Sequence, residues 1–149
     1  MFERLYAGVG ASCGLDQANR AYCWGRNSGG QLGDSSLTQS SVPVAVAGGI
    51  RFDSLSVGDT YACGLTNGAA YCWGQNYLGR LGLGSGAPQR VIVPTPVVGG
   101  HTFTSIHAGT LHTCGLTESG QAYCWGRNVY GQLGTGDDTN SSEPVPVVQ

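Results

Sequence analysis

Short apolar runs separated by turn residues recur along the whole chain. In residues 103–148 these runs are FTSIHAG, HTCGLT, QAYCWG and EPVPVV, and none of them keeps the roughly 3.6-residue apolar period of a helix. Runs of this length, bounded by turn residues, are typical of β-strands. The pattern therefore predicts four short strands in this part of the chain.

The same four-run pattern occurs three times. Each copy contains the phrase WGRNSGGQLG, WGQNYLGRLG or WGRNVYGQLG, and each phrase is followed by a polar loop and a run of proline and valine. Four strands per repeat of about 50 residues are typical of β-propeller blades. The sequence therefore predicts an all-β fold of three four-stranded antiparallel blades with the proline-rich strand at an outer edge. The predicted blades are residues 1–54, 55–105 and 106–149.

The segment CGLTNGAAYCWG, residues 63–74, predicts a β-hairpin and its register. Asn67-Gly68 is a strong two-residue turn, because both residues tolerate positive φ. Pairing outward from this turn sets Cys63 opposite Cys72 at a non-hydrogen-bonded position. The Cα atoms of such a pair lie ~4.5 Å apart, which is within the range of a disulfide.

The other two copies of this hairpin have one more residue between their cysteines. A three-residue turn ending in Asn19 or Gly120 accommodates it, because both residues favour the left-handed conformation. The alternatives are six buried free thiols, or a zinc site, which is disfavoured because zinc-binding cysteines are usually closer in sequence. The repeat selects one pairing among those that six cysteines allow: Cys13–Cys23, Cys63–Cys72 and Cys114–Cys124.

Three structural disulfides indicate an oxidising compartment, so we expect an extracellular, cell-surface or periplasmic location. The first residues, MFERLYAG, lack the apolar segment of a secretory signal, so an exported protein would have its signal removed or encoded outside this sequence. No apolar run approaches the ~20 residues that span a bilayer, and we expect no membrane insertion.

Composition and charge narrow the function classes. The chain has 26 glycines among 149 residues, which agrees with many tight turns. Its seven arginines are scattered, lysine is absent, and nine acidic residues give a net charge of -2. A nucleic-acid surface needs clustered cations, so we expect no nucleic-acid partner.

Two clusters suggest metal binding but have simpler explanations. His101, His107 and His112 are close in sequence, yet His107 and His112 have an odd spacing that would direct them to opposite faces of a strand. A structural role is therefore favoured. Asp137-Asp138 lies in a polar loop without the EF-hand pattern, and we expect a solvated loop there. We expect neither a metal nor a cofactor.

Two further features are candidate surface sites. Tyr77, Leu78, Val129 and Tyr130 follow Gly-x-Asn phrases, where they either contact a partner or pack against the next blade. Asn140 begins Asn-Ser-Ser, an N-glycosylation sequon in the third polar loop. No nucleophile–base arrangement is visible and no lysine could form a Schiff base, so we do not expect an enzyme.

The phrase YCWGRNVYGQLG with the upstream AGTLHTCGLT resembles the repeat of the regulator-of-chromosome-condensation family. The resemblance covers the whole chain and implies propeller blades, since members of that family form seven-bladed propellers. The cysteine-bearing version resembles the exported bacterial branch. Roles in the family include nucleotide exchange on a small nuclear GTPase, β-lactamase inhibition and surface functions, so the resemblance implies a fold rather than one activity. Three repeats and no basic surface argue against a nuclear exchange factor.

We therefore expect a non-catalytic structural or protein-interaction module, exported and stabilised by disulfides, whose protein partner is not apparent from the sequence. The alternatives are an inhibitor of a secreted enzyme and a carbohydrate-binding module. Three blades are fewer than the ~4–8 that close a propeller, so the first and last blades should each expose an apolar face. We expect these faces to pair head to tail in a ring or filament, unless the remaining blades of a longer chain cover them.

Overall fold

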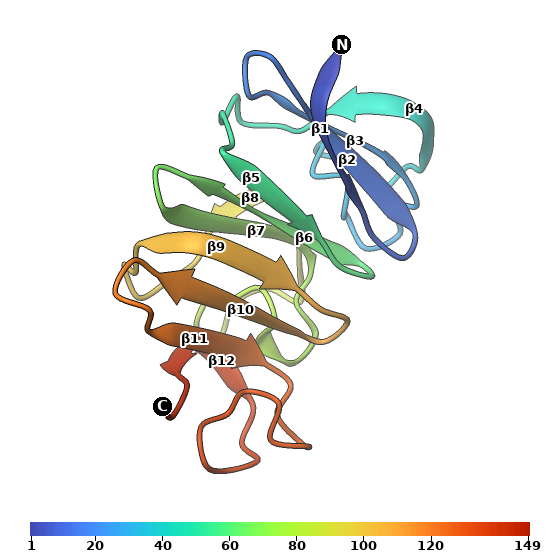
Figure 1. The fold of residues 1–149 in the computed structure, drawn as a ribbon. Helices are drawn as coiled ribbons and strands as arrows, with labels where there is room; N and C mark the ends of the chain where they lie inside the picture. Colours follow the sequence, from blue (N-terminus) through green and yellow to red (C-terminus); the bar gives the residue numbers. More distant parts are fainter.

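The computed structural model describes residues 1–149, which form twelve β-strands in three antiparallel sheets of four. In each sheet the strands lie in the order of the chain, and the three sheets follow one another from the N-terminus to the C-terminus (Figure 1). These are the three propeller blades that the sequence predicts. Blade 1 is β1 (Phe2–Ala7), β2 (Ala11–Asp16), β3 (Ala21–Gly25) and β4 (Ser40–Ala45). Blade 2 is β5 (Ser54–Val57), β6 (Tyr61–Thr66), β7 (Ala69–Gln75) and β8 (Arg90–Pro96), and blade 3 is β9 (Phe103–Ala108), β10 (His112–Thr117), β11 (Ala122–Gly126) and β12 (Ser141–Pro146).

The central hairpins have the registers that their turn residues predict. Cys63 pairs with Cys72 across β6 and β7, and Asn67 and Gly68 form the turn with φ values of 48° and 79°. In the other two blades the last residue of the longer turn also has positive φ. Each facing cysteine pair forms a disulfide with a Cα–Cα distance of 4.1 Å: Cys13–Cys23, Cys63–Cys72 and Cys114–Cys124.

The fourth strand of each blade lies at the outer edge of its sheet and begins earlier than the apolar pattern predicts. In blade 3, β12 begins at Ser141 rather than at Glu143, because Ser141 pairs with Gly126 on the other side of a bulge. The predicted divisions at 54/55 and 105/106 fall inside β5 and β9, so the connections between the sheets run through residues 46–53 and 97–102.

The hydrophobic core lies in the joints between neighbouring blades. One cluster of buried side chains fills the joint between blades 1 and 2, and a second fills the joint between blades 2 and 3. Blade 2 contributes one face to each joint, because side chains alternate between the two faces of a strand. Every blade also contains a close pair of aromatic rings, with centroids 5.7, 5.6 and 5.8 Å apart: Phe2–Trp24, Phe52–Trp73 and Phe103–Trp125.

The joint between blades 1 and 2 explains the repeated Gly-Gln-Leu-Gly phrase. Trp73 is fully buried there, and its Nε1 donates a hydrogen bond of 3.0 Å to the Gln31 carbonyl. Gly33 has a φ of 65°, and a Cβ at this position would lie 2.7 Å from Trp73 Nε1. A larger residue at Gly33 would therefore be strained and would displace the indole. The phrase on one blade is thus the receiving site for the tryptophan of the next blade.

The joint between blades 2 and 3 keeps the buried tryptophan but not its hydrogen bond, because Trp125 Nε1 has no partner and the Arg80 carbonyl accepts from the Thr113 hydroxyl. Arg80, which takes the place of the glutamine, is only 2% exposed, and its guanidinium donates to the carbonyls of Gln75 (2.8 Å) and Thr110 (2.6 Å). The guanidinium also lies 4.8 Å from the Tyr61 ring centroid. Desolvation lowers the pKa of Arg80 and raises the pKa of Tyr61 to about 12. The buried charge is thus balanced by carbonyl dipoles and an aromatic ring.

Candidate functional site

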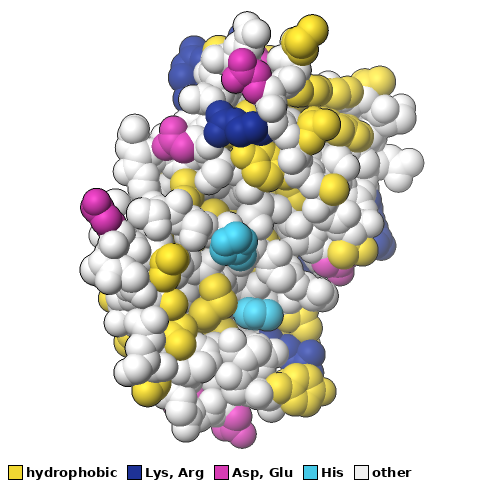
Figure 2. Space-filling view, in the orientation of Figure 1, with side chains coloured by type: hydrophobic (Ala, Val, Ile, Leu, Met, Phe, Trp, Pro, Cys, Tyr) yellow, Lys and Arg dark blue, Asp and Glu magenta, His cyan; other side chains and the backbone are white.

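The blade-1 end face is the outer side of the first sheet, which has no neighbouring blade. It consists of Phe2, Leu5, Ala7, Ser12 and Trp24. Leu5 is 68% exposed, whereas Leu55 and Ile106, which occupy the same position in β5 and β9, are 5% and 4% exposed. Trp24 is partly exposed, whereas Trp73 is fully buried. Figure 2 shows hydrophobic side chains gathered over the first sheet.

The blade-3 end face is the outer side of the last sheet. It consists of His112, Cys114, Leu116, Ala122 and Gly134. Leu116 is 41% exposed, whereas its counterparts Leu65 and Leu15 are 3% and 0% exposed. The two end faces therefore expose positions that are buried wherever another blade covers them.

Both end faces carry little charge. His112 is the one titratable side chain among the residues that define them, apart from the disulfide-bonded Cys114. Desolvation lowers the pKa of His112 below its ordinary value, so the imidazole is neutral at neutral pH. Two apolar faces without ionised side chains are suited to contacts with another protein surface rather than to ion binding.

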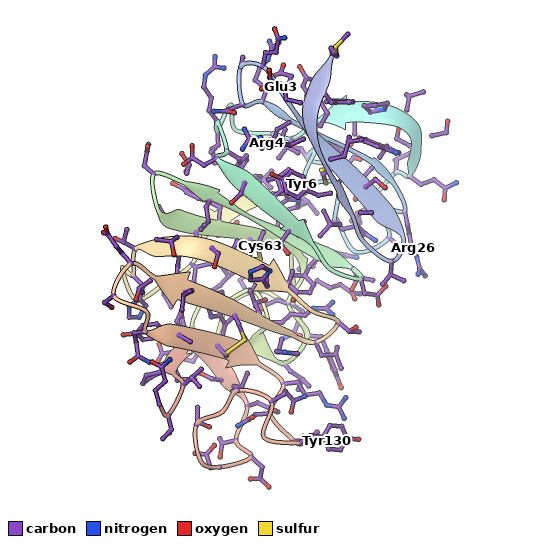
Figure 3. All side chains as sticks on the ribbon, viewed as in Figure 1. Glu3, Arg4, Tyr6, Arg26, Cys63 and Tyr130 are labelled. Carbon is purple, nitrogen blue, oxygen red and sulfur yellow. A yellow bond between two sulfur atoms is a disulfide. The ribbon has the colours of Figure 1, made fainter.

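A third surface feature is the groove between the first strands of the blades, β1, β5 and β9. It has a volume of about 540 Å³, and its polar lining includes Tyr6, Ser54, Ser56 and His107. Figure 3 shows Tyr6 beside β5. The Ser56 hydroxyl accepts a hydrogen bond of 2.8 Å from the Ala108 N–H. The lining offers hydroxyl groups and one imidazole but no carboxylate with which the imidazole could act as an acid–base pair.

The loop residues singled out from the sequence lie near the surface. Tyr77, Val129 and Tyr130 are 55%, 45% and 82% exposed, and Tyr130 projects from its loop into solvent (Figure 3). The Arg127 guanidinium lies 4.9 Å from the Tyr130 ring centroid. Leu78 is partly buried in a three-residue 3-10 turn, the one helical segment of the chain, so no helix reaches membrane-spanning length. The partner-binding role of these four residues stays a prediction.

The three histidines have separate surroundings. His101 stacks against Tyr123 with ring centroids 4.1 Å apart, His107 lies in the groove, and His112 lies on the blade-3 end face. The His112 carbonyl accepts a hydrogen bond of 2.7 Å from the Tyr61 hydroxyl. No group of three or more His, Cys, Asp or Glu side chains could hold a metal ion.

The third polar loop is organised by its own side chains. The Asp137 carboxylate accepts hydrogen bonds from the Thr139 N–H (3.0 Å) and the Thr135 hydroxyl (2.9 Å), and these bonds lower the pKa of Asp137. Asn140 is exposed, and its Oδ1 accepts a hydrogen bond of 2.7 Å from the Asn128 N–H. The amide nitrogen that would carry a glycan is not used in this contact, and glycosylation at Asn140 stays a prediction.

Comparison with known repeat families decides what kind of blade this is. The family described as "Regulator of chromosome condensation (RCC1) repeat" matches residues 19–65, 67–116 and 119–149, and a second model of that repeat matches residues 103–132. The chain belongs to this family. The matched residues include all three tryptophan phrases, so the resemblance seen in the sequence is confirmed.

Relatives of known identity contain this repeat within longer chains. The sequence is 33% identical to the ultraviolet-B receptor UVR8 of Arabidopsis thaliana over 93% of this chain and 34% of the receptor. It is 33% identical to the human E3 ubiquitin-protein ligase HERC2 over 89% of this chain and 3% of the ligase. The chain therefore spans about a third or less of the length of these relatives.

Solved structures also match the blade arrangement of this chain. Prp20p of Saccharomyces cerevisiae superposes with a TM-score of 0.90 at 22% identity, over 99% of this chain and 38% of that one. Human WBSCR16 gives 0.86 at 19% identity, over 98% and 37%. The ectodomain of the Physcomitrella patens receptor kinase CR4 gives 0.58 at 31% identity, over 85% and 29%. The first two likenesses show the fold.

The individual residues of the end faces were not identified from the sequence. The signal was nevertheless present, because the internal repeats of the sequence align Leu5 with Leu55 and Leu116 with Leu65. The exposed fractions differ only because a neighbouring blade covers the central copy and none covers the terminal ones. The end faces can therefore be identified from two facts: which positions of the repeat face a neighbouring blade, and whether the blade is the first, second or third in the chain.

The three disulfides of these repeats should differ in their rates of reduction. Cys114 is partly exposed on the blade-3 end face, whereas Cys13 and Cys63 are fully buried inside joints. Attack by a thiolate requires access to a sulfur atom, so we expect a dithiol such as dithiothreitol to reduce Cys114–Cys124 at least ~10-fold faster than the others. Alkylation of the native protein at timed intervals and peptide mapping would measure this. Equal rates for the three bonds would contradict it.

Proposed function

We propose that the chain is a non-catalytic protein-interaction module that binds further propeller blades through its two end faces. In the isolated 149-residue chain the available blades are those of other copies, so the module self-associates. The observation that carries the proposal is the contrast between Leu5, which is 68% exposed, and Leu55, which is 5% exposed at the same repeat position. Covering an apolar side chain of this size contributes roughly 1.5–3 kcal/mol.

Self-association between two different faces is heterologous, so it yields a closed ring or an open filament. Two copies would supply the ~4–8 blades of a closed propeller. If these residues belong to a longer chain, its other blades would cover the same two faces. In each case the end faces are binding surfaces for blades of this kind.

We also propose that the module is exported. Three disulfides in a chain of this size are favoured in an oxidising compartment. The similarity to a receptor-kinase ectodomain supports the same location, because that relative is itself an extracellular domain. An extracellular, cell-surface or periplasmic location would allow all three bonds to persist.

The proposal includes no catalytic step. The acidic and aromatic groups with perturbed pKa values make structural contacts: Asp16 accepts hydrogen bonds within its hairpin turn, Asp137 organises its loop, and Tyr61 lies in the joint between blades 2 and 3. A relative in the family, Prp20p, is described by its binding to Gsp1p and histones, which supports protein binding as the general role. A screen for hydrolase and nucleotide-exchange activity should give no turnover.

The native mass of the purified chain tests this function. We expect light scattering to show species larger than 15.4 kDa whose proportion rises with protein concentration. A ring would give one discrete mass, whereas a filament would give a continuous distribution. A well-folded species that remains at 15.4 kDa over the full concentration range would contradict the proposal.

A further inference from the structure

We infer that the blade-3 end face of one copy of this chain packs against the blade-1 end face of a second copy. In this joint, Trp24 of one copy occupies the place on blade 3 of the next copy that Trp73 and Trp125 occupy inside the chain. The joint presupposes the self-association proposed above and specifies its contacts. Three contacts shared by both internal joints carry the inference.

The first shared contact is that of the tryptophan with a glycine. A Cβ on Gly33 would lie 2.7 Å from Trp73 Nε1, and a Cβ on Gly82 would lie 2.7 Å from Trp125 Nε1. The indole therefore rests directly on the backbone of the preceding blade in both joints. The glycine has positive φ in both places, which a β-branched or bulky residue would not tolerate.

The second shared contact is a hydrogen bond from a loop to the outer strand of the next blade. The Ser35 N–H donates to the Ile92 carbonyl (3.1 Å), and the Gly84 N–H donates to the Ser142 carbonyl (2.9 Å). The counterpart on blade 3 is Gly136, whose N–H donates no backbone hydrogen bond within the chain. A carbonyl of β4 on a second copy is the matching acceptor.

The third shared contact is a close approach of backbones. A Cβ on Gly8 would lie 2.5 Å from the Gly58 carbonyl oxygen, and a Cβ on Gly58 would lie 2.7 Å from the Gly109 carbonyl oxygen. The three atoms nearest to a Cβ on Gly109 all belong to His112 of the same blade. In each internal joint, a glycine of one blade packs against the carbonyl of the corresponding glycine in the next blade. Gly109 has no such neighbour within the chain, and the Gly8 carbonyl of a second copy would supply it.

Each end of the chain carries one half of these contacts. On blade 3, the three atoms nearest to a Cβ on Gly134 all belong to Val147 of the same blade, and no tryptophan occupies the surface that receives one in the other blades. On blade 1, Trp24 is the partly exposed tryptophan that has no receiving blade. The Gln132 carbonyl occupies the place of the Gln31 carbonyl, which accepts the Trp73 hydrogen bond in the joint between blades 1 and 2. Blade 3 has the same Gly-Gln-Leu-Gly phrase as blade 1, whereas blade 2 has Arg80 in place of the glutamine and leaves Trp125 Nε1 without a partner, so the Gln132 carbonyl is the matching acceptor for Trp24 Nε1.

Like faces would not complete these contacts. Two blade-1 end faces would set Trp24 against Trp24 with no Leu-Gly backbone to receive either ring, and two blade-3 end faces would provide two receiving surfaces without a tryptophan. The joint is therefore heterologous, and each copy uses both faces toward two different neighbours or toward one neighbour in a closed ring.

Two variants that each disable one face test the polarity. Leu5→Arg places a charge on the blade-1 end face, and Leu116→Arg places one on the blade-3 end face. Both positions are exposed in the single chain, so we expect both variants to fold. Burying an unpaired charge in the joint should weaken association at least ~100-fold, which leaves each variant monomeric by itself. Circular dichroism melting curves verify the folding of each variant.

An equimolar mixture of the two variants should form a dimer of about twice 15.4 kDa and nothing larger. Leu5→Arg retains an intact blade-3 face and Leu116→Arg retains an intact blade-1 face, so one head-to-tail joint can form and then no further copy can add. If identical faces paired instead, a variant would form homodimers by itself: Leu5→Arg through two blade-3 end faces, or Leu116→Arg through two blade-1 end faces. Sedimentation velocity or light scattering distinguishes these outcomes.

Val93→Arg is the matched control, because Val93 is 38% exposed on the outer edge strand β8 of the central blade, which takes no part in the proposed joint. It should associate like the wild type. Two results would contradict the head-to-tail joint while leaving self-association intact. In the first, the wild type associates but the mixture stays monomeric; in the second, either single variant associates like the wild type. A monomeric wild type would overturn both the joint and the proposed function.

Discussion

Replacing Trp73 with alanine should lower the free energy of unfolding by about 3–5 kcal/mol. Trp73 is fully buried in the joint between blades 1 and 2, so the substitution removes a large apolar side chain and leaves a cavity. It also removes the hydrogen bond of 3.0 Å to the Gln31 carbonyl, which then has no indole donor. Chemical denaturation at equilibrium, with the disulfides intact, would measure the loss.

Trp24→Ala is the matched control because it makes the same change at the same repeat position. Trp24 is partly exposed and no blade covers it, so the loss in the single chain should be only about 1–2 kcal/mol. The same variant should weaken self-association. Equal losses for Trp24→Ala and Trp73→Ala in a monomeric sample would contradict the distinction between an internal joint and an open end face.

Removing the central disulfide should have the second-largest effect. The double variant Cys63→Ala, Cys72→Ala should lose about 3–4 kcal/mol, because it releases a loop in the unfolded chain and also leaves a cavity between two blades. Both cysteines are fully buried in the joint between blades 2 and 3. Denaturation curves of the variant and of the oxidised wild type would give the difference.

The corresponding double variant in blade 3, Cys114→Ala, Cys124→Ala, serves as the comparison. The sequence separations of the two bridges are 9 and 10 residues, so the loop contribution is nearly the same. Cys114 is partly exposed, so less cavity is created and the loss should be about 2–3 kcal/mol. A larger loss from the blade-3 bridge than from the central bridge would contradict the assignment of open and covered faces.

The sequence alone could predict the fold because its signals are local and repeated. Asn67-Gly68 determines the turn, the turn determines the register, and the register sets Cys63 against Cys72. The proline-rich fourth strands could be placed at the outer edges for a similarly local reason, since proline cannot donate to a neighbouring strand. The family comparison confirms the same repeat.

Contacts between blades could not be predicted in the same way, because they join residues that are far apart in the sequence. Nothing near Arg80 in the chain indicates that its guanidinium is buried against the Tyr61 ring and the Thr110 carbonyl. The left-handed conformation of Leu78 at φ 57° is also absent from the local pattern, since leucine disfavours it. The first residues of β12 could not be assigned to a strand from the sequence, because they are polar and pair with β11 through their backbone rather than through apolar side chains.

The central claim is that the two end faces are halves of one interface between blades, and amide hydrogen exchange at two protein concentrations tests it most directly. At high concentration, exchange should slow in residues 2–25 and 112–136, which carry the end faces, because the joint restricts local opening of these segments. Exchange in residues 54–75 of blade 2 should not change with concentration, because both faces of that sheet are already covered. Identical exchange at both concentrations, or slowing confined to the outer strands β4, β8 and β12, would contradict the claim.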